Sequence, residues 1–180
     1  MRKTSTKFLV ISVLGSDKPG SLNLLMKTIT NCGCNIVDSR IRFFGMELAA
    51  TLLISGHWNE LAKLETLLPV IVDKLELSIQ SKCTEKRVFT ENFIPYNIYI
   101  STIDSQGIIY KLTQFFSNEN IIINELFTDT YLAPYTQAPM VTITMSISIS
   151  ATMLVADLRE HFMLFCDDHN LDVVMEPQKY

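Results

Sequence analysis

The sequence predicts an α+β fold built from two consecutive βαββαβ modules, each an antiparallel sheet with both helices on one face. Runs typical of strands alternate with runs of helical periodicity in that order, and the order occurs twice in 180 residues. One ungapped shift of 87 positions brings turn residues onto turn residues and apolar residues onto apolar residues. We therefore expect an N-terminal domain at 1–83, a polar linker at 84–92 and a C-terminal domain at 93–180.

The N-terminal module begins with the pattern of a strand, a turn and a helix. The apolar run from Phe8 to Leu14 predicts the strand, and Asp17-Lys18-Pro19-Gly20 predicts a turn because Asp, Pro and Gly favour turns. Helical periodicity follows, and it places on one face Leu22, Leu25, Met26 and Ile29. Gly33 suits the position after a helix, where a left-handed conformation is common.

The rest of this module is a predicted hairpin, a second helix and a last strand. The strands are expected at 35–44, 47–55 and 75–82, with the hairpin turn at Gly45. Asn59 is the expected N-cap of the second helix, whose apolar face includes Leu61, Leu64 and Leu68. Pro69 is expected to end or kink that helix because proline lacks an N–H group.

The C-terminal module repeats this order with a longer hairpin loop. Apolar and hydroxyl residues alternate from Val141 to Ile149, which predicts a half-buried strand. Residues 132–139 hold two prolines and form the loop. The other predicted strands are 96–103, 121–130 and 172–176, and the helix faces include Ile108, Leu112, Phe116, Leu154, Leu158 and Phe162. The shift of 87 pairs Asp17 with Asp104 and Gly20 with Gly107, which suits duplicated domains better than a short solenoid repeat.

Charge and hydropathy argue against two classes of protein. The net charge is -4 and the sequence pI is about 5.3, whereas a protein that binds nucleic acid directly is expected to carry a basic patch. No signal peptide is visible, and no run reaches the roughly 18 apolar residues of a membrane-spanning helix. We therefore expect a cytoplasmic protein with reduced thiols and no membrane contact.

No pattern of catalytic or metal-binding residues is found. Cys32 and Cys34 are spaced as C-x-C, unlike the pairs of a zinc ribbon, and buried apolar roles suit them better. The three histidines have neither metal-ligand nor triad spacing, and no nucleotide-binding or nucleophile motif occurs. We expect no catalytic residue, no metal and no cofactor, and therefore a protein that is not an enzyme.

Two motifs resemble those of ACT domains, which are ferredoxin-like modules. Residues 11–20 resemble the first strand and D-x-P-G loop, and residues 32–40 resemble the junction between the first helix and the second strand. The resemblance covers almost the whole chain and is stronger over 8–69 than after 93. It looks most like the tandem ACT regulators of the glycine cleavage system. It implies a regulator that senses glycine, contacts a LysR-type transcriptional activator, represses the glycine cleavage operon and forms a homodimer.

The candidate ligand-binding residues are Asp17, Lys18, Pro19, Gly20, Asn35 and Ile36. A loop that enters a helix N-terminus offers N–H groups and a favourable dipole to an amino-acid carboxylate. Pro19 restricts the loop, and Gly20 lets the backbone approach the ligand. The ligand ammonium could be accepted by the Asn35 carbonyl or by Asp17. A structural interpretation remains equally open. The loop can be a simple turn between strand and helix, and Asn35 can be a residue chosen after the helix because asparagine tolerates left-handed conformations.

The second copy departs from this pattern. Gln106 stands where Pro19 does, Ile122 stands where Asn35 does, and Asn124 lies two residues further on. A second equivalent site is therefore not expected.

In the N-terminal module, Asp38 and Arg40 alternate with the apolar Val37 and Ile41, so they fit a solvated strand face.

Two alternatives to this function remain open. One is an ACT regulator that senses a different amino acid, and the other is a small ferredoxin-like enzyme such as an acylphosphatase. That enzyme needs an arginine in the first loop, where Lys18 is the cation present. An RNA-binding module of the same topology needs basic, aromatic strand motifs, which this chain lacks.

Overall fold

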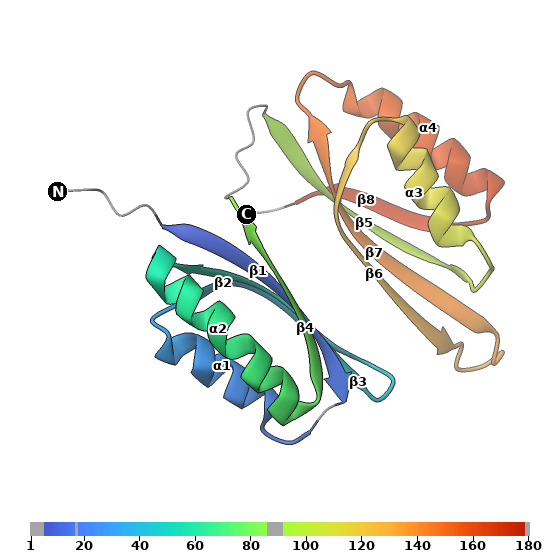
Figure 1. Ribbon diagram of the computed structural model, residues 1–180. Coiled ribbons are helices and arrows are strands. Elements are labelled where there is room, and N and C mark those ends of the chain that lie inside the picture. The colour runs from blue at the N-terminus through green and yellow to red at the C-terminus, as the bar shows by residue number, and fades with distance from the viewer. Residues whose placement is uncertain (1–5, 17, 86–91, 179–180) are drawn as a thin grey trace. The chain divides into compact units, whose positions relative to one another are not determined.

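The computed structural model describes residues 6–16, 18–85 and 92–178, and the chain divides into two compact units, Met1–Arg87 and Val88–Tyr180 (Figure 1). We call them unit 1 and unit 2. Of the predicted linker, residues 86–91 lie outside the described residues, and Thr84 belongs to a strand. Within the described ranges, no helix is long and apolar enough to cross a membrane.

Unit 1 has the predicted βαββαβ order. Its elements are β1 (Lys7–Ser16), α1 (Ser21–Asn31), β2 (Asn35–Phe44), β3 (Glu47–Gly56), α2 (Trp58–Leu75) and β4 (Leu77–Thr84). The four strands are antiparallel in the order β2-β3-β1-β4, and α1 and α2 cover one face of the sheet (Figure 1). Leu9, Ile11 and Val13 point from the central strand β1 into the core beneath the helices and are almost wholly buried.

Unit 2 repeats the architecture, so the predicted tandem fold is confirmed. Its elements are β5 (Phe93–Ile103), α3 (Ile108–Asn118), β6 (Ile122–Leu132), β7 (Pro139–Ser150), α4 (Val155–Asp168) and β8 (Asp172–Pro177). The strand order is β6-β7-β5-β8. A cluster of phenylalanines holds α3 against α4, with ring centroids of Phe116 and Phe162 5.1 Å apart and both side chains buried.

Two details of α2 differ from the sequence-based expectation: Asn59 is not its N-cap, and Pro69 does not end it. The helix starts at Trp58 with His57 as its N-cap, and the His57 N–H donates to the Glu60 carboxylate at 2.6 Å. This hydrogen bond satisfies a backbone N–H group that would otherwise be free, so Asn59 is not needed as the N-cap. Pro69 lies inside the helix, which continues to Leu75. The buried residues Leu68 and Ile71 lie on either side of Pro69, and their packing offsets the hydrogen bond that proline removes.

A β-bulge occurs at the same place in both units. The register of β2 against β3 shifts between Ile36 and Asp38, and the register of β6 against β7 shifts between Ile123 and Glu125. The extra residues, Val37 and Asn124, are 87 positions apart, like the turns. The duplication therefore extends to an irregularity of the backbone that strand periodicity does not predict.

We predict that Phe162→Ala weakens unit 2 selectively. Removing a buried aromatic ring leaves a cavity, and we expect unit 2 to lose about 3–5 kcal/mol of its free energy of unfolding. The measurement is denaturant unfolding followed by circular dichroism for the whole chain and by fluorescence for unit 1, where the single tryptophan lies.

The matched control is Leu164→Ala on the same helix, where the side chain is 58% exposed. We expect that change to stay within about 0.5 kcal/mol. Equal losses from Phe162→Ala and Leu164→Ala would show that the phenylalanine cluster does not stabilise the unit.

Candidate functional site

The N-terminus of α1 has the geometry of an anion-binding site. Gly20 is its N-cap, with a left-handed φ of 91°, and among the described residues no side chain caps the helix. The Ser21 N–H donates to the Lys18 carbonyl at 2.9 Å, which closes the turn. No residue of the first turn is acidic. The positive end of the helix dipole is therefore not offset by a carboxylate of the first turn.

Ser21 is a residue that the sequence analysis missed. Its side chain is 1% exposed, and its Oγ has no hydrogen-bond partner among the residues that the structure describes. A buried hydroxyl without a partner costs about 1–3 kcal/mol. The corresponding residue of unit 2 is Ile108, which is buried and apolar. This comparison is the signal that could have found Ser21, because one copy places a hydroxyl where the other accepts a hydrocarbon.

Lys18 is held beside this helix end by Glu76. The Lys18 Nζ lies 2.7 Å from Glu76 Oε2, and both side chains are exposed. The hydrogen bond from Lys18, with the charge of the ammonium, holds the pKa of Glu76 below its ordinary value. Glu76 follows α2 in a left-handed conformation, with φ 55°. The loop cation therefore has an acidic partner that an anionic ligand can displace.

The structure does not bring all the predicted ligand residues together within unit 1. Asp17 lies outside the described residues, whereas Lys18, Pro19 and Gly20 are exposed next to the start of α1. Asn35 is exposed at the start of β2, where it pairs with Ser55, which in turn pairs with Phe8. The loop follows Ser16, at the other end of β1 (Figure 1). Eight residues of strand separate the two ends by roughly 26 Å, at about 3.3 Å per residue.

Ile36 differs from its neighbour Asn35. It pairs with Ile54 on the helix-covered face of the sheet and packs against the core of unit 1. Its side chain is therefore part of the apolar support beneath the start of β2.

Unit 2 keeps the backbone of the loop but not its side chains. Gly107 is the N-cap of α3 with φ 87°, and no described side chain caps that helix either. The exposed Gln106 stands in place of Pro19. Asn124 is engaged within its own sheet, because its Nδ2 donates to Ser148 Oγ at 2.8 Å. The polar features of the α1 terminus are therefore not repeated.

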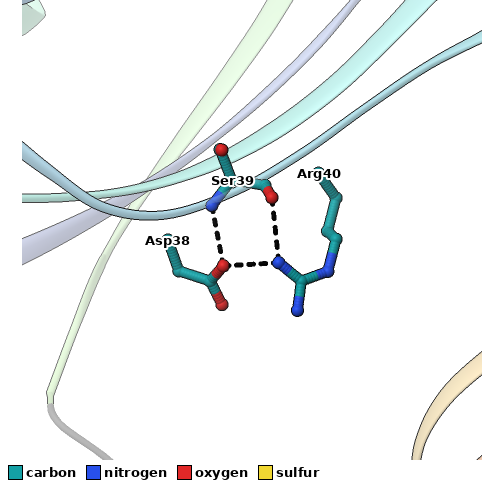
Figure 2. A network of polar contacts seen from close by, with 3 residues as sticks. All are labelled: Asp38, Ser39 and Arg40. Carbon is teal, nitrogen blue, oxygen red and sulfur yellow. Dashed lines mark hydrogen bonds and ion pairs between the residues drawn. The ribbon is translucent and has the colours of Figure 1, made fainter.

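A polar network beside the bulge of β2 is exposed and satisfied locally. Figure 2 shows the carboxylate of Asp38 accepting hydrogen bonds from the Ser39 N–H and from the Arg40 guanidinium. The guanidinium also donates to the Ser39 carbonyl at 2.9 Å. Asp38 and Arg40 lie on the sheet face opposite the helices, which agrees with a solvated strand face.

Two buried thiols, Cys34 and Cys166, are poorly suited to act as metal ligands or nucleophiles. Burial, with nearby Cys32 and Glu60, raises the pKa of Cys34, and burial raises the pKa of Cys166 to about 12. Thiols of this kind stay protonated near neutral pH. No group of three or more His, Cys, Asp or Glu residues in the described part of the chain is arranged to hold a metal ion.

Comparisons with known proteins agree with the tandem fold. Residues 7–82 match the model of the ACT domain. The glycine cleavage system transcriptional repressors of Escherichia coli (strain K12) and Shigella flexneri are each 31% identical over 170 residues, which cover 94% of this chain and 90% of theirs.

Two solved structures share the complete tandem fold. One is provisionally assigned as a glycine cleavage system transcriptional repressor. It superposes with a TM-score of 0.70 at 28% identity, over 97% of this chain and 99% of that chain. The other, a protein of unknown role from Galdieria sulphuraria, has a TM-score of 0.77 at 22% identity, over 97% and 100%, and shows the fold alone. The chain belongs to the ACT-domain family, as a homologue of the glycine cleavage system transcriptional repressor.

Proposed function

We propose that this protein is an amino-acid-sensing transcriptional regulator that binds a small amino acid, glycine in the first place, at the N-terminus of α1. The observation that carries the proposal is the helix N-terminus beside the buried Ser21 hydroxyl that has no partner. The full-length similarity to transcriptional repressors of the glycine cleavage system supports both the regulatory role and the choice of effector.

In this proposal the amino-acid carboxylate lies against the backbone N–H groups of the α1 terminus. Gly20 places no side chain there, and a Cβ built on it would meet no atom within 4 Å, so the approach is open. Lys18 adds a positive charge that Glu76 currently neutralises. A small rearrangement of the first turn brings the Ser21 hydroxyl to the ligand and satisfies it.

The ligand ammonium needs an acceptor, and among the described residues of the loop, 18–20, no side chain carries one. Asn35 carries a suitable carbonyl, but it lies at the other end of the sheet of unit 1. We propose that Asn35 of a second copy completes the site, in keeping with a homodimer. Ligand binding at this site would then depend on the association of two modules.

The output proposed for the binding event is a change in protein contact. The effector favours one packing of the modules, and that packing alters contact with a LysR-type transcriptional activator, so that the glycine cleavage operon is repressed. Direct binding of DNA has no part in this scheme, and neither does a catalytic step. The proposed location of the protein is the cytoplasm.

We predict that glycine, serine or another small amino acid binds the full-length protein. Isothermal titration calorimetry and thermal shift measurements on a panel of small amino acids test this, since a ligand that binds the folded state raises its apparent stability. Asn35→Ala should reduce the affinity strongly, whereas Ile122→Ala should leave it unchanged. A panel that gives neither heat nor a thermal shift would contradict the proposed function.

Ser21→Ala separates a ligand contact from a structural role. Because the hydroxyl has no partner, its removal should leave the free protein as stable or stabilise it by up to about 1–3 kcal/mol. The same change should weaken ligand binding, measured by calorimetry. A variant that binds the effector as tightly as the parent chain would remove Ser21 from the site. Ser105→Ala, in the matching loop of unit 2, is the control.

The pKa of Glu76 should report whether the ligand engages Lys18. The hydrogen bond from Lys18 lowers this pKa. The Lys18–Glu76 pair therefore stabilises the fold at pH values above the ordinary carboxyl pKa. That stabilisation is lost as the pH falls through the lowered pKa of Glu76. A ligand carboxylate that draws Lys18 away should raise the pKa of Glu76 towards its ordinary value. Carboxyl-carbon NMR titration with and without glycine measures this, with Lys18→Met as the reference for a released Glu76.

A further inference from the structure

An apolar groove lies at the end of unit 1 that is opposite the α1 terminus, where β1 begins and β4 ends. Its volume is about 430 Å³, and its lining includes Phe8, Trp58, Leu61, Ala62 and Cys83. This size falls within the range of sites that accept a large side chain or a small molecule. The groove shares no residue with the candidate amino-acid site.

At the groove α2 carries a small residue, whereas α4 carries a long one at the same position in the helix. Ala62 is the fifth residue of α2, and Arg159 is the fifth residue of α4. The Arg159 Nη2 donates to the Met175 carbonyl of the edge strand β8 at 3.0 Å. Alanine is too short to make a contact of this kind from α2 to β4. An arginine at position 62 would therefore place a long side chain beside the groove.

The strand beside the groove is an edge of its sheet. In the order β2-β3-β1-β4, the outer side of β4 has no neighbouring strand among the described residues. Such an edge offers backbone N–H and C=O groups to an added strand. A groove between a helix and a sheet edge suits an extended peptide, because backbone hydrogen bonds provide affinity while a pocket for one side chain provides specificity.

Trp58 and the charges at the groove indicate what such a peptide would carry. Trp58 is 72% exposed, and exposed tryptophans beside apolar pockets are typical anchors of protein–protein contacts. Two carboxylates, Glu65 and Glu85, line the groove together with one ammonium, Lys7. The excess of negative charge favours lysine or arginine next to the apolar side chain.

We propose that this groove binds an extended segment of a partner protein, which adds alongside β4 and inserts one large apolar side chain, flanked by lysine or arginine, between α2 and the strand. The surface is separate from the α1 terminus, so the inference does not depend on the proposed function. It gives unit 1 a protein-docking surface at a helix position where unit 2 has Arg159, whose guanidinium is bonded to β8.

The chain carries two reporters for this surface. Trp58 is its single tryptophan, and Cys83 is exposed while the other three cysteines are buried. The probe is an acetylated and amidated peptide, Thr-Lys-Phe-Lys-Thr, titrated into the full-length protein up to about 1 mM, the weak limit of specific recognition. We expect a saturable change in Trp58 emission and a several-fold slower reaction of Cys83 with a maleimide.

Substitutions on both partners make the test specific. Ala62→Arg, which copies unit 2, should weaken binding at least about tenfold, or about 1.4 kcal/mol. Alanine in place of the peptide phenylalanine, or glutamate in place of its lysines, should do the same. Tyr110→Arg is the control, because Tyr110 is 66% exposed in unit 2 and should not alter binding. Trp58→Leu, followed through Cys83 labelling, provides a second variant should Ala62→Arg disturb the fold.

Three results would overturn the proposal. They are no response of either reporter to the peptide, equal binding by the parent chain and a folded Ala62→Arg variant, and binding of free phenylalanine as tight as that of the peptide. The last result would assign the groove to a small molecule instead of a protein segment. Glycine binding is measured in a separate titration. A protein that does not bind glycine would therefore contradict the proposed function and leave the peptide test of the groove unaffected.

Discussion

One-sided burial of the central strand is the constraint on which each unit depends. In β1 and β5 every second residue lies beneath two helices, while the residues between them face the other side of the sheet. Both helices must therefore lie on the same face, and the βαββαβ order allows this with short connections. The loop that enters α1, the groove beside α2 and the bulge in β2 are all positioned by this arrangement.

The fold was predictable because it depends on periodicity, which is local in sequence. Alternation marks the strands, helical spacing marks the helices, and the shift of 87 positions identifies the duplication. Features that depend on contacts between distant residues were not predictable. The position of Pro69 inside α2 depends on the packing of its buried face, and the groove depends on how α2 lies beside the start of β1 and the end of β4. Of the candidate site, the glycine turn was predictable, whereas the burial of Ser21 required the folded core.

The two units show how a duplicated backbone can acquire different chemistry. Gly20 and Gly107 keep the same left-handed turn, and the bulges lie at matching positions. The side chains beside those features differ, with Ser21 opposite Ile108 and Ala62 opposite Arg159. In the first pair, unit 1 has a buried hydroxyl without a partner among the described residues. In the second pair, it has a small side chain that lines a groove. Unit 2 has a buried apolar side chain at the first position and, at the second, an arginine that is hydrogen-bonded to the Met175 carbonyl.

The bulge at Val37 has a consequence for how β2 can change in evolution. Before it, the even-numbered Ile36 faces the helices, and after it the odd-numbered Ile41 and Phe43 pair with core residues of β3. A deletion within the later part of the strand would turn the residues on one side of it onto the wrong face of the sheet. A deletion at position 37 would remove only the extra residue and leave every other side chain facing as before. The irregularity thus marks a place where the length of the chain can vary without inverting the sheet.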